Sequence, residues 1–127
     1  MHIEFFPDGA VDCPLVLLHG RDPAAAARLR EKVAALAAEQ VQRVAVHEIP
    51  GFESVGDCRL FISIGRSDLG TQPLRAGHVF ECQLRPVTWH DVEGLLEPFT
   101  EQAFCDGFQW LDSHGEIQLL ISGHRGW

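Results

Sequence analysis

The chain has 127 residues, of which 46% are hydrophobic and 22% are charged, and this length and composition are typical of one soluble globular domain. Its net charge of −8 argues against a nucleic-acid partner, because proteins that follow a phosphate backbone gain affinity from Lys and Arg. The apolar run Leu15–Leu18 is much shorter than the roughly 20 residues that cross a bilayer, so we expect no membrane segment.

Two strands are predicted at the start of the chain. His2–Phe6 alternates in the manner of an edge strand, and a turn-forming Pro-Asp-Gly follows it. Residues 14–18 form a continuous apolar run, which is typical of a strand buried on both faces. We therefore expect the second strand to lie inside the fold.

A helix and a third strand follow. Asp22 and Pro23 predict a helix start, because the carboxylate can accept from free backbone amides and proline suits the first helical position. Residues 24–40 are rich in helix formers, with an apolar stripe at Leu29, Val33, Leu36 and Ala37. A strand over residues 43–49 would complete a right-handed strand–helix–strand unit, with its two strands parallel.

The middle of the chain predicts two further strands. Only about nine residues separate 43–49 from the run Arg59–Gly65, which is too short for a parallel crossover, so these two strands should be antiparallel. The next segment, residues 65–77, is predicted to be a loop. Residues 78–85 then alternate apolar with polar side chains, as in a strand with one solvated face.

The last third predicts a helix and a hairpin. Thr88 can cap the helix, with Asp91 three residues on approximating a capping box. Pro98 should end or kink this helix. Residues 108–112 and 116–122 flank a Ser-His-Gly turn, which indicates a β-hairpin.

Together these elements predict one domain over residues 1–127 of the α+β class. We expect a mixed β-sheet of five to seven strands with two helices, including one βαβ unit and a C-terminal β-hairpin. The four cysteines, Cys13, Cys58, Cys82 and Cys105, are widely spaced in a chain with enough apolar residues to fold without bridges. They are therefore expected to be reduced, as in a cytoplasmic protein.

The most unusual feature is an acidic stretch between Arg85 and Arg125 that contains no Lys or Arg. It carries seven carboxylates: Asp91, Glu93, Glu97, Glu101, Asp106, Asp112 and Glu116. His90, Glu93 and Glu97 follow at helical spacings of three and four, so they should share an outward face. We interpret this face as solvated, or as a docking surface for a basic protein, in preference to a metal site.

A second candidate site lies at predicted strand ends. If the second and third strands are parallel neighbours, His19 and the pair His47 and Glu48 sit near their carboxyl ends, where open α/β sheets often bind ligands. Two histidines beside a carboxylate can serve as acid and base. The histidines and cysteines lack close ligand spacing, so no metal and no cofactor are expected.

The last forty residues or so resemble small uncharacterised bacterial proteins of the toxin-immunity type. The resemblance rests on the Trp89 helix, the strings FQWLD and GEIQLLIS, and the closing Gly126-Trp127. It implies a bacterial protein whose activity is binding, and it assigns no functional residue.

Our first hypothesis is a non-catalytic protein-binding domain, such as an immunity protein or inhibitor, that docks a basic partner such as a toxin domain. Its binding residues would be Asp91, Glu93, Glu97, Glu101 and Trp127. The alternative is a small enzyme or ligand-binding domain that uses His19, His47 and Glu48. A third is a subunit that completes a larger assembly.

Overall fold

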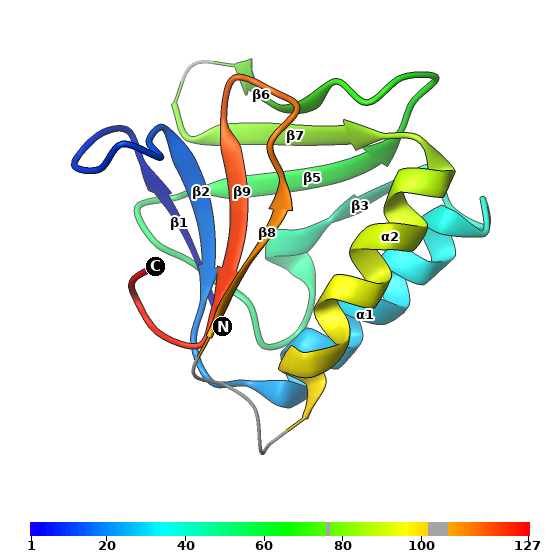
Figure 1. The fold of residues 1–127 in the computed structure, drawn as a ribbon, viewed down its shortest axis with the longest axis horizontal. Helices are drawn as coiled ribbons and strands as arrows, with labels where there is room; N and C mark the ends of the chain where they lie inside the picture. Colours follow the sequence, from blue (N-terminus) through cyan, green and yellow to red (C-terminus); the bar gives the residue numbers. More distant parts are fainter. Residues whose placement is uncertain (76, 102–106) are drawn as a thin grey trace.

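A computed structural model describes residues 1–75, 77–101 and 107–127. Within these residues, nine strands form two mixed sheets and two α-helices pack together beside them (Figure 1). The α+β class predicted from the sequence is confirmed. The predicted single sheet is wrong, because the strands divide into one sheet of five and one of four.

The first sheet has the strand order β4-β1-β2-β9-β8. Its strands are β1 (His2–Phe6), β2 (Leu15–His19), β4 (Glu53–Ser54), β8 (Phe108–Asp112) and β9 (Gln118–Ser122). The predicted hairpin is confirmed, since β8 and β9 are antiparallel. β2 lies between β1, which is antiparallel to it, and β9, which is parallel.

The second sheet has the order β3-β5-β7-β6. Its strands are β3 (Arg43–Ala45), β5 (Arg59–Ile64), β6 (Gly70–Arg75) and β7 (Val79–Leu84). The predicted antiparallel pairing of β3 with β5 is confirmed. β6 occupies part of the predicted loop, where Pro73 argues against a strand. The proline is tolerated because β6 is an edge strand, where one backbone donor can be missing.

The predicted βαβ unit is wrong. β2 belongs to the first sheet and β3 to the second, so the two strands are not neighbours. The parallel neighbour of β2 is β9, from the far end of the chain. β3 is a short edge strand that passes directly into a 3-10 turn, Val46–Glu48, in place of the predicted strand over residues 43–49.

Helix α1 (Pro23–Ala37) begins where the sequence predicts. The side chain of Asp22 accepts a hydrogen bond from the Ala25 amide at 3.0 Å, and Pro23 is the first helical residue, where its fixed φ costs nothing. Leu29, Val33 and Leu36 are buried. The predicted apolar stripe is therefore the face that packs inward.

Helix α2 (Pro86–Leu96) begins three residues earlier than predicted. Thr88 is not the cap, because its amide already donates to the Arg85 carbonyl inside the first turn. The Arg85 amide instead donates to Asp68 at 2.9 Å, so a carboxylate from a distant loop supports this end of the helix. The helix ends at Leu96, and the predicted stop near Pro98 takes the form of a 3-10 turn, Glu97–Thr100.

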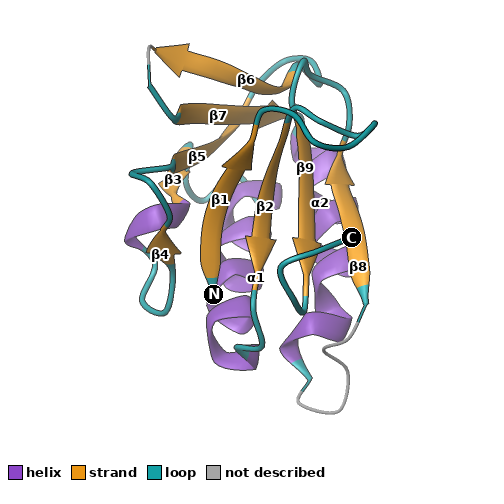
Figure 2. Ribbon diagram, turned by 90° about the vertical axis from the view of Figure 1, so that its left-hand side faces the viewer, coloured by secondary structure: helices purple, strands orange, loops and turns teal. Residues whose placement is uncertain are grey.

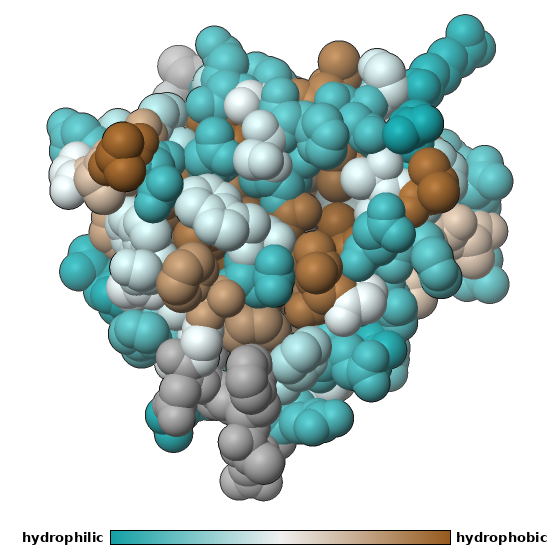
Figure 3. Space-filling view, in the orientation of Figure 1, coloured by the Kyte–Doolittle hydropathy of each residue, from teal (hydrophilic) through white to brown (hydrophobic). Residues whose placement is uncertain are grey.

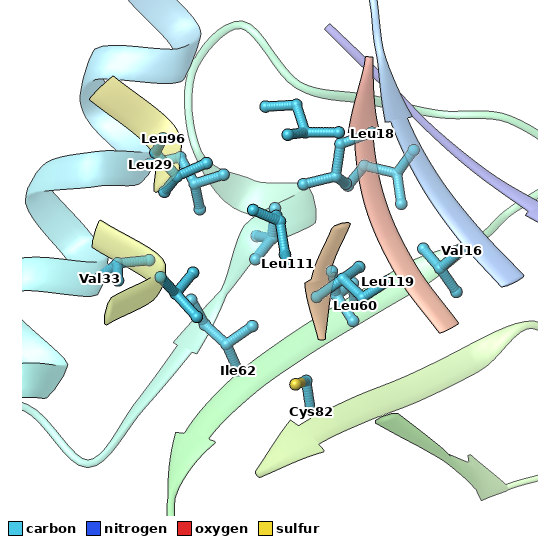
Figure 4. Close-up of a cluster of buried hydrophobic side chains, with 14 of the residues drawn as sticks. Val16, Leu18, Leu29, Val33, Leu60, Ile62, Cys82, Leu96, Leu111 and Leu119 are labelled. Carbon is cyan, nitrogen blue, oxygen red and sulfur yellow. The ribbon is translucent and has the colours of Figure 1, made fainter. Parts of the chain in front are cut away.

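One apolar core joins both sheets to both helices (Figure 4). Leu18 of β2, Leu60 of β5 and Leu96 of α2 lie at most 1% exposed within it, and burying such a side chain contributes roughly 1.5–3 kcal/mol. Trp89 is also buried, and its indole N–H donates to the Ser63 carbonyl at 2.8 Å. The core therefore ties the two sheets into one unit.

A second, smaller cluster covers the opposite face of the first sheet. Leu15, Leu17 and Leu120 are completely buried there. The partly buried residues packed against them are Phe6, Cys13, Trp110 and Trp127. β2 is thus buried on both faces, as its unbroken apolar run predicts.

Candidate functional site

Two acidic side chains, Glu93 of α2 and Glu97 of the following 3-10 turn, meet Arg30 of α1. The Nε of Arg30 lies 2.8 Å from a carboxylate oxygen of Glu93, and its Nη2 lies 3.8 Å from Glu97. His90 and Glu93 line one groove and Glu93 and Glu97 both contact Arg30, so the three residues share a face, but Glu93 is paired and only partly exposed on it. This face flanks the seam where the two helices pack, and the sequence pattern of α2 alone could not show that α1 would lie there.

Two adjoining concavities, of about 290 and 330 Å³, run along this seam. We call them the seam groove; its lining residues are Ala27, Arg30, Glu31, Ala34, Ala37, Ala38, His90, Glu93 and Thr100. Alanine side chains on α1 leave the space open, while carboxylates stand at its walls. The groove can accept a long, positively charged side chain, whose stem would contact the alanines and whose head would meet the carboxylates.

Apart from Glu97, which lies near Arg30, the rest of the acidic stretch does not line this groove. Asp91, Glu97 and Glu101 are exposed, and Asp106 lies outside the described residues. Asp112 is buried, with 1% of its side chain exposed, and accepts from the Nδ1–H of His114 at 2.6 Å. Asp112 therefore organises the β8–β9 turn and does not contribute to a docking surface on the stretch from Asp91 to Glu116.

The same turn packs closely against the second sheet. Gly70 has a φ of +74°, which favours glycine, and a side chain on it would collide with the backbone of Gly115. Thr71 and Ile117 form an isolated bridge between the two sheets. The second carboxylate oxygen of Asp112 is buried at this junction, without a hydrogen-bond partner among the described residues.

Trp127 lies on the other side of the first sheet from the helices (Figure 2). Its ring contacts Phe6 at a centroid distance of 5.2 Å, and its indole N–H donates to Asp12 at 3.0 Å. Trp127 covers the second apolar cluster and does not share a surface with the carboxylates of α2. The predicted binding set, Asp91, Glu93, Glu97, Glu101 and Trp127, is thus divided between two faces.

The alternative site is not assembled either. His19 ends β2 in the first sheet, whereas His47 lies in the 3-10 turn after β3. The Nδ1 of His47 is 3.2 Å from both the amide and the carbonyl of Leu60, and its ring packs edge-on against Phe61. Glu48 is exposed beside a separate groove. The predicted proximity failed because it required β2 and β3 to be neighbours.

His19 instead belongs to a polar cluster that the sequence analysis missed. The Nε2 of His19 lies 3.0 Å from a carboxylate oxygen of Glu4, and the guanidinium of Arg125 donates to the same carboxylate. The ring of His19 also contacts the ring of His2. Hydrogen bonds from Arg125 lower the pKa of Glu4 against the opposing effect of burial, and His19 lowers it further. Burial lowers the pKa of His19, although Glu4 opposes this.

This arrangement is an ion pair on the outer face of the first sheet, with Glu4 largely buried and Arg125 exposed. The Glu4 carboxylate is directed to Arg125 and His19, and Ser122 is fully buried beside them with its hydroxyl 3.3 Å from His124. The only signal for the cluster was the outward alternation of His2 and Glu4 along β1. Register with β2 was needed to place them beside His19.

Among the described residues there is neither a metal-binding cluster nor a membrane-spanning helix. No group of three or more His, Cys, Asp or Glu side chains there could hold a metal ion. None of the helices in that part of the chain is long and apolar enough to span a membrane. One cavity lined by residues of the main core has a volume of about 10 Å³, no more than one water molecule requires.

Comparison with known proteins returns no match to any family model, to any curated protein or to any solved structure.

Proposed function

We propose that the protein is a non-catalytic protein-binding domain that docks a basic partner at the α1–α2 seam. The observation that carries the proposal is the seam groove, with small apolar side chains at its floor and carboxylates at its walls. A Lys or Arg of a partner would find an apolar contact and a counter-charge in the same place.

Charge supports this choice of surface. Glu31, Glu93 and Glu97 surround one cation, Arg30, and the exposed Asp91 and Glu101 lie on the same segment as Glu93. Arg30 therefore offsets only part of the local negative charge. Complementary charge speeds the encounter with a partner and excludes like-charged proteins.

A bacterial immunity protein or inhibitor of a basic toxin is the specific form of this proposal. The C-terminal resemblance and the acidic composition support it. We also propose a cytoplasmic location, which is supported by three cysteines, Cys13, Cys58 and Cys82, that are free thiols in the structure.

The test compares two double charge reversals that change net charge equally. Glu31→Lys with Asp91→Lys alters an exposed residue that lines the groove and an exposed residue of α2, and Glu48→Lys with Glu116→Lys alters exposed residues elsewhere. Glu93 and Glu97 are left unchanged, because reversing either would place a cation against Arg30. Circular dichroism and thermal midpoints establish that both variants are folded.

Proteins from an extract of the source cells are captured on the wild-type chain and identified. Each captured protein is then purified, and its association with the wild-type chain and with both variants is measured. We expect a basic protein whose association slows by about tenfold for the seam variant, much less for the control, and further with added salt. Capture of nothing, capture of an acidic protein, or equal binding by both variants would contradict the proposal.

A further inference from the structure

A polar cluster lies on the outer face of the first sheet. It consists of four side chains, which we call the outer-face cluster: His2 and Glu4 of β1, His19 of β2, and Arg125 of the segment after β9. Glu4 is its centre, because the Nε2 of His19 is 3.0 Å from one carboxylate oxygen and Arg125 donates to both oxygens. The ring centroids of His2 and His19 are 5.2 Å apart. One carboxylate therefore serves a guanidinium and an imidazole that can gain a charge.

The same cluster holds the C-terminal segment, residues 123–127, which we call the C-terminal cover. The guanidinium of Arg125 lies 5.1 Å from the centroid of the Phe6 ring, and the ring of Trp127 contacts Phe6 as well. Beneath Trp127 lies the second apolar cluster, whose completely buried members are Leu15, Leu17 and Leu120. The bond between Arg125 and Glu4 therefore helps to keep apolar surface out of water.

The charge of the cluster is balanced while His19 is neutral. A neutral imidazole donates its Nε2–H to Glu4, and the charges of Glu4 and Arg125 then cancel. Protonation of His19 adds a cation where the side chains of His19 and Glu4 are only 8% and 13% exposed, so the repulsion of Arg125 is weakly screened. Protonation of His2 brings a further cation against the ring of His19. Acid therefore loads this part of the sheet with positive charge.

The other described groups near this pair of histidines do not restore the balance. On β9, His19 lies beside Ser122, whose hydroxyl is 3.3 Å from the Nδ1 of His124, and His124 can itself gain a proton. On β4, Glu53 lies 3.8 Å from His2, but the Glu53 side chain is 79% exposed, and such exposed pairs contribute little. Glu4 is thus the carboxylate on which the outer-face cluster depends.

We propose that the outer-face cluster is an acid-sensitive latch, which releases the C-terminal cover as His19 and His2 gain protons. Arg125 is the group that leaves, because its side chain is already 63% exposed, whereas His19 is fixed within the central strand β2. Release uncovers the second apolar cluster. It enlarges an apolar surface that is already visible near the centre of Figure 3, over the region of β8 and β9.

Two pKa shifts agree with a response in the range where histidines titrate. A hydrogen bond from Arg125 lowers the pKa of Glu4 from 4.5, against the effect of burial, so this carboxylate keeps its charge while histidines gain protons. Burial lowers the pKa of His19 from 6.5, although Glu4 opposes this. A lowered pKa in the closed form means that the closed form loses stability as the pH falls below 6.5. Protons therefore favour the open form, in which His19 is less buried.

The latch is separate from the seam groove. The helices that form the groove lie on the other side of the first sheet from the C-terminal cover (Figure 2). The latch therefore does not rest on the proposed binding of a basic partner, and each proposal can fail without the other.

The test follows the indole N–H of Trp127 by nuclear magnetic resonance in the purified chain, from about pH 7.5 to about pH 5. Each exchange rate is divided by that of a free indole at the same pH, because solvent exchange itself depends on pH. We expect the protection of Trp127 to fall by about fivefold or more, while the Leu18 amide in the main core stays protected. A dye that binds exposed apolar surface should bind more strongly over the same range.

Two matched variants assign the response to His19. His19→Gln keeps a donor for Glu4 but cannot gain a proton, so its Trp127 protection should fall much less than that of wild type. His90→Gln makes the same substitution at an exposed residue of α2, and it should respond as wild type does.

The titration of the His19 ring in wild type gives a measurement that needs no variant. The midpoint of His19 protonation should coincide with the midpoint at which Trp127 loses protection. Constant protection of Trp127, an equal fall in His19→Gln, simultaneous loss of protection at Leu18, or midpoints more than about one pH unit apart would each overturn the proposal.

Discussion

Arg125 and Glu4 are 121 positions apart in the chain, yet they form a two-pronged ion pair with Nε–Oε1 and Nη2–Oε2 distances of 3.0 and 2.8 Å. The pair fastens the segment after β9 to β1, across the outer face of the first sheet. His19 holds the same carboxylate from β2. The cover over the second apolar cluster is therefore attached by charge as well as by the packing of Trp127.

Arg125→Gln should loosen this cover while leaving the main core intact. The variant loses the ion pair with Glu4, so the indole N–H of Trp127, which donates to Asp12, should exchange faster with solvent. The thermal midpoint should fall slightly. Nuclear magnetic resonance of the indole signal provides the measurement, with Arg66→Gln at an exposed loop position as the matched control; equal exchange in both variants would contradict the expectation.

Acid should weaken the attachment of α2 through Asp68. Burial raises the pKa of this carboxyl, but bonds from the Arg85 amide and guanidinium and from Thr88 outweigh it and lower the pKa from 3.8 to about 2. A lowered folded-state pKa stabilises the fold above pH 3.8, and this contribution is lost as pH falls towards about 2.

The urea midpoint of wild type should therefore decline over that interval. Asp68→Asn should be less stable than wild type at neutral pH, and the two curves should converge in acid. Parallel curves for wild type and Asp68→Asn would show that this carboxyl does not carry the effect.

Trp89→Phe should destabilise the junction between α2 and β5. It removes the indole N–H that satisfies the buried Ser63 carbonyl, and an unsatisfied buried acceptor costs about 1–3 kcal/mol. The smaller ring adds a cavity cost of its own. Urea unfolding gives the free energy; Val87→Ala, at a side chain 58% exposed, should change it by less than about 0.5 kcal/mol. A similar loss in both variants would argue against this contact.

The buried thiols should resist modification in the folded protein. Burial, with a smaller effect from the charge of Glu4, raises the pKa of Cys58 to about 12, and burial also raises the pKa of Cys82. Thiolate is the reactive form, so both should react with a thiol-specific disulfide reagent far more slowly than the half-buried Cys13. Equal rates for native and urea-unfolded protein at Cys58 and Cys82 would contradict this.

Local signals in the sequence predicted most of the elements. Asp22 and Pro23 marked the start of α1 because the capping group and the capped amide are three residues apart. The support at the start of α2 was missed because the carboxylate that holds the Arg85 amide, Asp68, is 17 residues away from it. Local pattern found the elements and could not show which distant groups complete them.

The candidate sites failed for the same reason. The periodicity of α2 shows which residues share a face of the helix, but it does not show what packs beside that face. Glu93 was therefore expected to be exposed, whereas it pairs with Arg30 of α1. His19 and His47 were brought together by an assumed parallel pair, and the parallel partner of β2 is β9. Long-range strand order was the missing information in both the fold and the site.

The central place of β9 in the first sheet has a consequence for synthesis on the ribosome. β9 lies between β2 and β8, so β2 keeps one unpaired side until residues 118–122 have been made. The whole second sheet, with both helices, emerges before that strand does. The buried apolar run of β2 therefore lacks its parallel partner during most of synthesis, and the first sheet can be completed only after the β8–β9 hairpin has emerged.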